Sequence, residues 1–422
     1  MAYIGVLGFA IFLLTAWALS GGKRIFNWRL FAWTIVFEFV FGWFVFRYSA
    51  GLNFFTAVNA FLVGIIDAAM AGPQFVFGSL ADPAASAANG VGFVLVFQGF
   101  AQLFVIASLL AALYHLGVLG RILKFFAAVF SRLTRISGAE ALAATANVFA
   151  GNEGILAIRP CLAQLTKSEL CVLLATCMAT ISANMLVVYV NVLRHVFPTI
   201  GGHFVSASIL SVPLATLMAK LATPETAQPE TLGVNVEPYY KREDSLVAAV
   251  VSGANDGFKV IVGIVALLIA GIGILAILNA GIAWGGGELG LGADWSLQKF
   301  IGYLFYPCAW LMGVPWHETP TVAQLLGTRV IATEVPAYVE LADLMRSGQL
   351  SPRSAVIAAY ALCGYAHIPS MAIYVGALAA LTPERKADIA AVAWTALVVA
   401  TLACLGTGAI AGLFYRGAAI LS

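Results

Sequence analysis

Charge is scarce in this chain, and that scarcity excludes a soluble globular protein. Only 10% of the 422 residues are Asp, Glu, Lys or Arg, whereas 61% are hydrophobic and the mean hydropathy is +0.95. Soluble domains carry about a quarter charged residues. The formal net charge of +2 is spread over separate segments, so the chain lacks the basic footprint of a nucleic-acid-binding protein. We therefore expect a polytopic membrane protein that has the lipid bilayer, and no nucleic acid, as a partner.

The sequence also lacks the short motifs of hydrolytic and metal chemistry. It contains no G-x-S-x-G, no C-x-x-C, and no second histidine that would complete H-E-x-x-H after His317 and Glu318. These absences weigh against a membrane-embedded hydrolase, so we expect no enzyme. The cysteines all lie in or beside apolar segments and are expected to be packing residues: Cys161, Cys171, Cys177, Cys308, Cys363 and Cys404.

What the chain does contain is a series of apolar stretches of about twenty residues, each long enough to cross a bilayer as a helix. Eight are expected, at residues 2–19, 30–48, 92–117, 168–193, 204–221, 258–280, 355–381 and 390–415. Continuous stretches of this kind predict an all-α protein, because barrel strands would alternate in hydrophobicity. With the N-terminus in the periplasm, every Lys and Arg cluster that follows an odd-numbered stretch faces the cytoplasm. We expect a multi-pass protein of a bacterial inner membrane in this orientation.

Two further apolar stretches, 139–164 and 298–340, are interrupted by Gly, Pro and charge. The interruptions read "NVFAGNEGILAIRP" and "LMGVPWHETPTVAQ". Non-helical backbone at membrane depth survives only where protein or a watery cavity satisfies it, so each stretch is interpreted as a re-entrant hairpin with its tip at the interruption. The alternative is an ordinary helix kinked by Gly or Pro.

The same order of elements follows each hairpin. A polar connector, "QLTKSEL" or "QLSPRSA", leads to a helix that is broken near its middle, at "CMATISANM" or "CGYAHIPSM". The charge pattern gives the two halves opposite orientations. An inverted repeat with paired broken helices is typical of secondary transporters, whose binding sites lie between the half-helix ends.

Two carboxylates within these segments are functional candidates on physical grounds. An acid at membrane depth is costly unless it has partners or water, so Glu153 and Glu334 are expected to serve a site. For Glu153 the structural alternative is an ion pair with Arg159. For Glu318 a site role and a structural role stay equally open.

Six strings carry a resemblance to a known family. They are "ANVFAGNEGILAIRP", "LTKSEL", "AKLATPET", "GVPWHET", "TEVPAY" and "ALCGYAHIPSMAI". In this order and spacing they resemble the concentrative nucleoside transporter family over nearly the whole chain, although none would be specific alone. The resemblance implies a homotrimeric symporter that imports nucleosides with sodium by an elevator movement.

The resemblance also implies a division into a scaffold and a moving transport domain. Scaffold helices one to three would occupy residues 1–125, and scaffold helix six residues 246–285. The first transport half, with an interfacial helix, hairpin 1 and helices four and five, would occupy 126–222. A cytoplasmic linker would follow at 223–245, and the second transport half, with hairpin 2 and helices seven and eight, at 286–422.

At the first hairpin tip the chain departs from the family string "GQTEAP", whose Gln, Thr and Glu meet the nucleobase. Here the tip is one residue shorter. Glu153 matches the family Glu, Asn152 stands in for the Gln, and the Thr has no counterpart. The resemblance thus implies that Asn152 and Glu153 bind substrate.

In the second half the resemblance implies a sugar-binding set. Glu334 matches the Glu that binds the ribose hydroxyls, and Ser370 matches a sugar-binding Ser. His367 stands where the family has an Asn, and Tyr365 replaces a Phe that lies against the base. His317 and Glu318, at the interruption of the second hairpin, complete the expected substrate-binding residues.

The coupling ion implied by the resemblance is sodium, with no other cofactor. Asn147 and Thr180 match positions that ligate sodium, and carbonyls corresponding to Ala150 and Ile181 would complete the site. Hard oxygen ligands of this kind suit a hard cation. Two alternatives stay open: proton coupling, if Glu153, Glu334 or His367 titrates during transport, and another polar hydroxylated solute, such as a modified nucleoside.

Overall fold

The computed structural model describes residues 2–22, 25–150, 153–240, 242–288 and 295–417, apart from the side chains of residues 2, 149, 150 and 153. These residues form helices and connecting segments, with no strand beyond one isolated bridge between Ser137 and Leu232. Seven described helical segments are long and apolar enough to cross a membrane, and Tyr3–Ala18 and Ile368–Leu381 are shorter apolar helices. The expected all-α architecture is confirmed.

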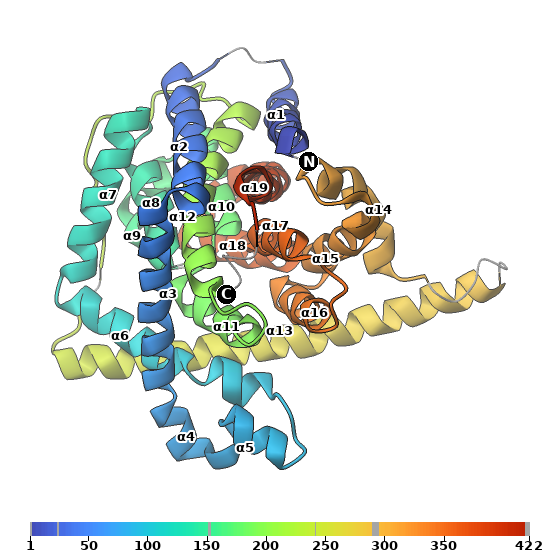
Figure 1. The fold of residues 1–422 in the computed structure, drawn as a ribbon. Helices are drawn as coiled ribbons and strands as arrows, with labels where there is room; N and C mark the ends of the chain where they lie inside the picture. Colours follow the sequence, from blue (N-terminus) through green and yellow to red (C-terminus); the bar gives the residue numbers. More distant parts are fainter. Residues whose placement is uncertain (1, 23–24, 151–152, 241, 289–294, 418–422) are drawn as a thin grey trace.

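One group of helices comes from the N-terminal part of the chain and from its middle. α2 and α3 are separated only by Tyr48 and form one long rod in Figure 1. α13 is 43 residues long, packs against α6 and runs beneath α11 and α16 in this view. The bounds are α1 Ala2–Ala18, α2 Trp28–Arg47, α3 Ser49–Ala69, α4 Ala71–Phe77, α5 Pro83–Ala88, α6 Leu103–His115 and α13 Leu246–Glu288, with short η1 Gly78–Leu80 and η2 Leu95–Phe100.

The remaining helices form two series with the same order: a helix, a hairpin, a broken helix and a long helix. The first series is α7 Val118–Thr134, α8 Gly138–Ala150, α9 Glu153–Ala157, η3 Arg159–Gln164, α10 Lys167–Ala179, α11 Ala183–Leu193 and α12 Ile200–Ala222. The second is α14 Leu297–Leu311, η4 Trp316–Glu318, α15 Thr319–Ile331, α16 Glu334–Arg346, α17 Pro352–Leu362, α18 Ile368–Leu381, η5 Pro383–Arg385 and α19 Lys386–Phe414. The core lies where α10, α12, α17 and α19 pack together.

Local sequence explains where the broken helices begin. Thr166 caps α10 in a capping box with Glu169, and Ser351 caps α17 by accepting from the Ser354 N–H. Both helices then stop early, at Ala179 and at Leu362, and restart as α11 and α18. The expected breaks at "CMATISANM" and "CGYAHIPSM" are confirmed.

One apolar helix was missed by the eight expected spans. α3, Ser49–Ala69, carries Asn59 and Asp67, which interrupt its apolar pattern. Asn59 Nδ2 donates to the Pro198 carbonyl at 3.1 Å, and Asp67 pairs with Arg194 at 2.5 Å. These polar side chains therefore have partners at both ends of the loop that joins α11 to α12, which the pattern of one segment cannot reveal.

The tip of the second hairpin was also wrongly predicted. Its turn lies at Ala332 and Thr333, between α15 and α16, and "GVPWHET" instead joins α14 to α15. Pro320 lies in the first turn of α15, where its fixed φ and missing N–H are tolerated, so it begins a helix rather than turning the hairpin. The turn directly precedes Glu334, the first residue of α16.

The segment that links the two series packs against the foot of the first hairpin. The Gly138 N–H donates to the Thr231 carbonyl at 2.9 Å, and the Tyr239 N–H donates to the Ala157 carbonyl at 2.8 Å. A Cβ at Gly138 would lie 1.9 Å from the Val234 carbonyl oxygen, so the close approach requires glycine.

Candidate functional site

The two helix breaks meet at the centre of the fold. The hydroxyl of Tyr365 accepts from the Ser182 N–H at 3.0 Å and lies 2.9 Å from Ser182 Oγ. Gly364, with φ of 154°, brings the second break against the first, because a Cβ there would lie 2.9 Å from the Ala179 backbone. Backbone freed from both helices is therefore gathered at one place, as at the solute sites of transporters.

Glu334 lies at this meeting point, buried and held by two partners. Tyr189 of α11 donates its hydroxyl hydrogen to Glu334 Oε1. His367 Nε2 lies 2.7 Å from Glu334 Oε2, and the two residues are only 2% and 3% exposed respectively. The Tyr189 contact is a hydrogen bond and the His367 contact is a close pair of nitrogen and oxygen, and both help a buried carboxylate to be tolerated. The second hairpin, α11 and the break before α18 thus converge on one carboxylate.

The ring of His367 also caps α18. Its Nδ1 accepts from the Ser370 N–H at 3.1 Å, and its Nε2 lies 2.9 Å from Ser370 Oγ. A nitrogen that accepts a backbone N–H carries no hydrogen, so the ring hydrogen is on Nε2, toward Glu334 and Ser370. The arrangement therefore turns the acceptor nitrogen toward the backbone of α18 and the donor nitrogen toward Glu334.

A cavity of about 600 Å³ opens beside these residues. One wall is formed by the helix breaks and the second hairpin tip, and includes Glu334, Tyr365, His367 and Ser370. Another part of the lining belongs to α13, from Lys259 to Leu268. This volume suits a small organic ligand, and four of the expected substrate-binding residues line the same space.

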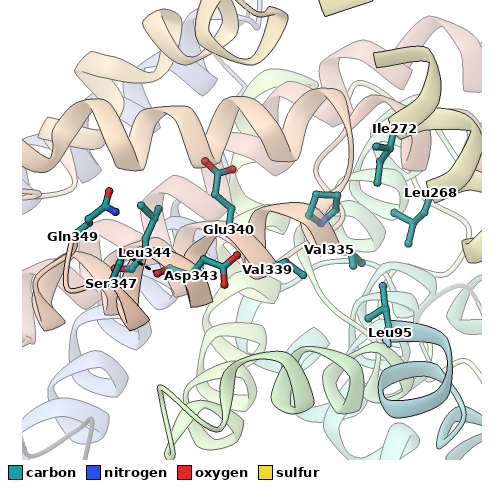
Figure 2. A pocket seen from close by; sticks show the side chains of 11 residues that line it. Leu95, Leu268, Ile272, Val335, Val339, Glu340, Asp343, Leu344, Ser347 and Gln349 are labelled. Atoms are coloured by element: carbon teal, nitrogen blue, oxygen red, sulfur yellow. Dashed lines mark hydrogen bonds between the residues drawn. The ribbon is translucent and has the colours of Figure 1, made fainter. Parts of the chain in front are cut away.

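A second cavity, of about 620 Å³, adjoins the first and shares Val335 and Leu268 with it. Figure 2 shows the carboxylates of Glu340 and Asp343 along α16, and apolar side chains of Leu268 and Ile272 at the other end. Glu340 already accepts from Thr328 and Gln324, and Asp343 pairs with Arg346 at 2.6 Å. We therefore take the first cavity, with its convergent polar groups, as the candidate site.

The residues expected to hold a cation lie in the first hairpin and at the break that follows α10. Asn147 Nδ2 donates to Thr176 Oγ1 at 3.3 Å, in the last turn of α10. Within the described part of the chain, Asn147 Oδ1 is buried without a hydrogen-bond partner. Thr180 and Ile181 follow at the break of α10, both buried, and Ala150 is the last residue of α8. An orphaned oxygen beside a helix C-terminus fits a site for a hard cation.

The expected residues of the first hairpin tip are only partly described by the structure. Asn152 and the side chain of Glu153 lie outside the described residues, although Glu153 begins α9. The guanidinium of Arg159 lies 5.9 Å from the centre of the Tyr239 ring. Arg159 thus has a contact in the linking segment.

His317 and Glu318 do not line the cavity. The side chain of His317 is 79% exposed, and Glu318 accepts from the Ser351 N–H and hydroxyl at 3.1 and 2.8 Å, at the start of α17. In this structure the two expected substrate contacts therefore lie outside the candidate cavity. Both residues lie in the connection between α14 and α15. The turn of the hairpin comes after α15, at Ala332 and Thr333.

Sequence reasoning missed four residues at or beside the site. Tyr189 bonds Glu334, and Asn184 and Lys259 line the cavity. Arg329, fully buried in α15, donates from Nη1 to the Ala361 carbonyl at 2.5 Å and so joins the hairpin to the end of α17. A lone lysine in the apolar α13 was an available signal, since a charge at membrane depth is costly without a cavity or a partner.

Two family models match separate parts of the chain. The family model described as "Na+ dependent nucleoside transporter C-terminus" matches residues 203–412, and the corresponding N-terminus model matches residues 7–80. A solved structure of CNTnw in an inward-facing substrate-bound state has a TM-score of 0.90 at 30% identity and covers 98% of both chains.

Relatives with similar sequences span nearly the whole chain. "Uncharacterized transporter YutK" of Bacillus subtilis is 30% identical over 97% of this chain and 98% of its own. "Nucleoside permease NupC" of Helicobacter pylori is 29% identical over 97% of each chain. "Sodium/nucleoside cotransporter 1" of Rattus norvegicus is 29% identical over 98% of this chain, which spans 64% of that relative's length.

Proposed function

Because this chain belongs to the family of Na+-dependent nucleoside transporters, we propose that it is a symporter that imports nucleosides across a bacterial inner membrane. The observation that carries the proposal is the buried set of Glu334, His367 and Ser370 beside a cavity of about 600 Å³. The family is one of transporters rather than enzymes. Binding, release and movement of a solute are therefore the chemistry to explain.

The second hairpin and the break before α18 would bind the ribose. Glu334 is an acceptor-only carboxylate, which suits the hydroxyl donors of a sugar. Ser370 and the Nε2–H of His367 lie beside it and add a hydroxyl and a donor. Tyr365 would lie against the base with its ring, since its hydroxyl is already engaged by Ser182. Asn152 and Glu153 remain the proposed base contacts from the first hairpin.

Sodium is the proposed coupling ion. Asn147 and Thr180 would supply side-chain oxygens, and Ala150 and Ile181 carbonyl oxygens. The unpartnered Asn147 Oδ1, within the described residues, supports this assignment. Asn147 contacts the end of α10, whose break also adjoins Tyr365, so bound sodium would order the element that holds the substrate.

The proposed mechanism is an elevator movement within a homotrimer. The scaffold would comprise residues 1–125 and 246–285, and the moving domain residues 126–222 and 286–422, joined by a cytoplasmic linker at 223–245. The N-terminus would be periplasmic. The cavity lies between α13, on the scaffold side, and the helix breaks, on the moving side, which supports relative movement of the two.

Uptake by proteoliposomes tests the proposal. Purified protein should accumulate radiolabelled uridine when an inward sodium gradient is imposed. Replacement of sodium by choline at constant pH should abolish the accumulation. Undiminished uptake in choline would overturn sodium coupling, and absence of uptake for every nucleoside would overturn the function.

Proton coupling is the second candidate, because His367 and Glu334 form a buried titratable pair within the site. In that case a pH gradient alone should drive uridine uptake. A related alternative is a modified nucleoside or another polar hydroxylated solute, which competition with uridine uptake would identify.

A further inference from the structure

The cavity carries two polar groups that the sugar-binding and sodium-binding residues do not use. Lys259 lies on α13, a different helix from those that carry Glu334 and His367, and Asn184 lies in the first turn of α11. Both line the cavity. If Glu334 and Ser370 hold the sugar, a base that extends across the cavity approaches α13.

Lys259 is available for a ligand. It is the only lysine of α13, and its ammonium contacts Asp256, one turn earlier, at 2.8 Å. The two side chains are 74% and 52% exposed, so the pair is weakly held and can exchange partners. Asp256 orients the ammonium without burying it. Two charged residues on a mostly apolar helix are tolerated beside a watery cavity, and the same cavity can hold a polar ligand.

Asn184 offers an amide that has an unused oxygen. Within the described residues, its Oδ1 is buried and has no hydrogen-bond partner. A buried acceptor without a donor is costly, which points to a group that arrives with the ligand. The amide can donate as well as accept, so Asn184 adapts to different base edges, whereas Lys259 cannot.

We propose that Lys259 and Asn184 recognise the nucleobase, and that Lys259 selects bases that present a carbonyl oxygen to α13. An ammonium only donates, so it pairs with the O4 of uracil or the O6 of hypoxanthine. The amino groups of cytosine and adenine at those positions would face a donor with a donor. The inference rests on the proposed nucleoside transport and names the substrate class: oxo-substituted nucleosides such as uridine and inosine.

Binding to purified protein at saturating sodium tests this selection. We expect the wild type to bind uridine more tightly than cytidine, and inosine more tightly than adenosine, by about tenfold or more, because a charged hydrogen bond is lost. Lys259→Gln, whose amide both donates and accepts, should bring both ratios close to one. Lys259→Arg should keep them, since guanidinium is also donor-only.

Lys124→Met is the matched control. Lys124 is an exposed lysine of α7 that pairs with Glu237 and lies outside the cavity. The ratios of uridine to cytidine affinity and of inosine to adenosine affinity in Lys124→Met should equal those of the wild type. Correct folding of each variant is checked by its thermal unfolding temperature and by its sodium affinity.

Three results would overturn the inference alone. They are equal wild-type affinity for uridine and cytidine, unchanged ratios in Lys259→Gln, and stronger binding of uridine 5′-monophosphate than of uridine, which would assign the ammonium to a phosphate. Failure of the wild type to bind any nucleoside would overturn the proposed function itself.

Discussion

Tyr365 and Ser182 are 183 residues apart in the chain, yet the tyrosine hydroxyl accepts from the serine N–H at 3.0 Å and lies 2.9 Å from its Oγ. This contact joins the break between α10 and α11 to the break between α17 and α18. The contact therefore links the two halves of the repeat at the points where their helices are broken.

Tyr365→Phe should destabilise the protein. The change keeps the ring but leaves the buried N–H and hydroxyl of Ser182 without their partner, at a cost of about 1–3 kcal/mol. We expect a lower thermal unfolding temperature in detergent, with nucleoside affinity less affected. Tyr303→Phe, at an exposed position of α14, serves as the control. Equal unfolding temperatures for Tyr365→Phe and wild type would contradict the role of this hydroxyl.

Glu334→Gln should weaken the binding of ribonucleosides at least about tenfold, because an ionised acceptor for sugar hydroxyls is replaced by a neutral amide. Titration calorimetry with uridine measures the loss. A 2′,3′-dideoxy analogue provides the control, since it lacks the hydroxyls and should lose little affinity. Equal losses for both ligands would mean that Glu334 acts through the fold and does not contact the sugar.

Asn147→Ala should raise the sodium concentration needed for half-maximal nucleoside binding by about tenfold or more, because a carbonyl ligand of the ion is removed. Thr180→Val should act in the same direction. Thr216→Val is a matched control, since Thr180 and Thr216 both donate to the carbonyl four residues earlier. A control shift as large as that of Thr180→Val would remove sodium binding as the explanation.

Nucleoside affinity should fall at low pH because of His367. Its Nδ1 accepts the Ser370 N–H, so a second proton on the ring must break the cap of α18 and also changes the charge beside Glu334. Affinity measured from about pH 5.5 to 8 at saturating sodium should therefore decrease toward the acidic end. His367→Asn retains an N-cap residue and should give a flatter profile. Parallel profiles would show that His367 does not sense protons.

Several features of the fold could be predicted because their signals are local. Long apolar stretches specify spanning helices, and within the polar interruption at 147–160 Gly154 of α9 packs against Asn147 of α8. The breaks after Ala179 and Leu362 likewise follow from residues at those points. Glu334, Tyr365, His367 and Ser370 were assigned to one site by their matching strings, and all four line one cavity.

Chain order alone could not predict the features that depend on neighbours across helices. Pro320 and Glu318 read as a hairpin tip, but Glu318 bonds Ser351 of a later helix and the turn forms at Ala332 and Thr333. α3 was missed because Asn59 and Asp67 interrupt its apolar pattern. The partner of Asp67 is Arg194, which is far away in the chain. The two members of such a pair lie far apart in the sequence. Only the packing of the helices therefore decides whether a polar side chain finds a partner and is tolerated within a helix.

The sequence by itself therefore determined that this protein is a helical membrane protein with an inverted repeat, since hydrophobic length and helix breaks are written along each segment. The tertiary structure alone decided what surrounds the candidate site. Tyr189 reaches Glu334 across 145 residues, and Lys259 and Asn184 come from two helices on different sides of the cavity. A site between packed helices depends on which faces meet, and that is set by the joint packing of all helices rather than by any one segment.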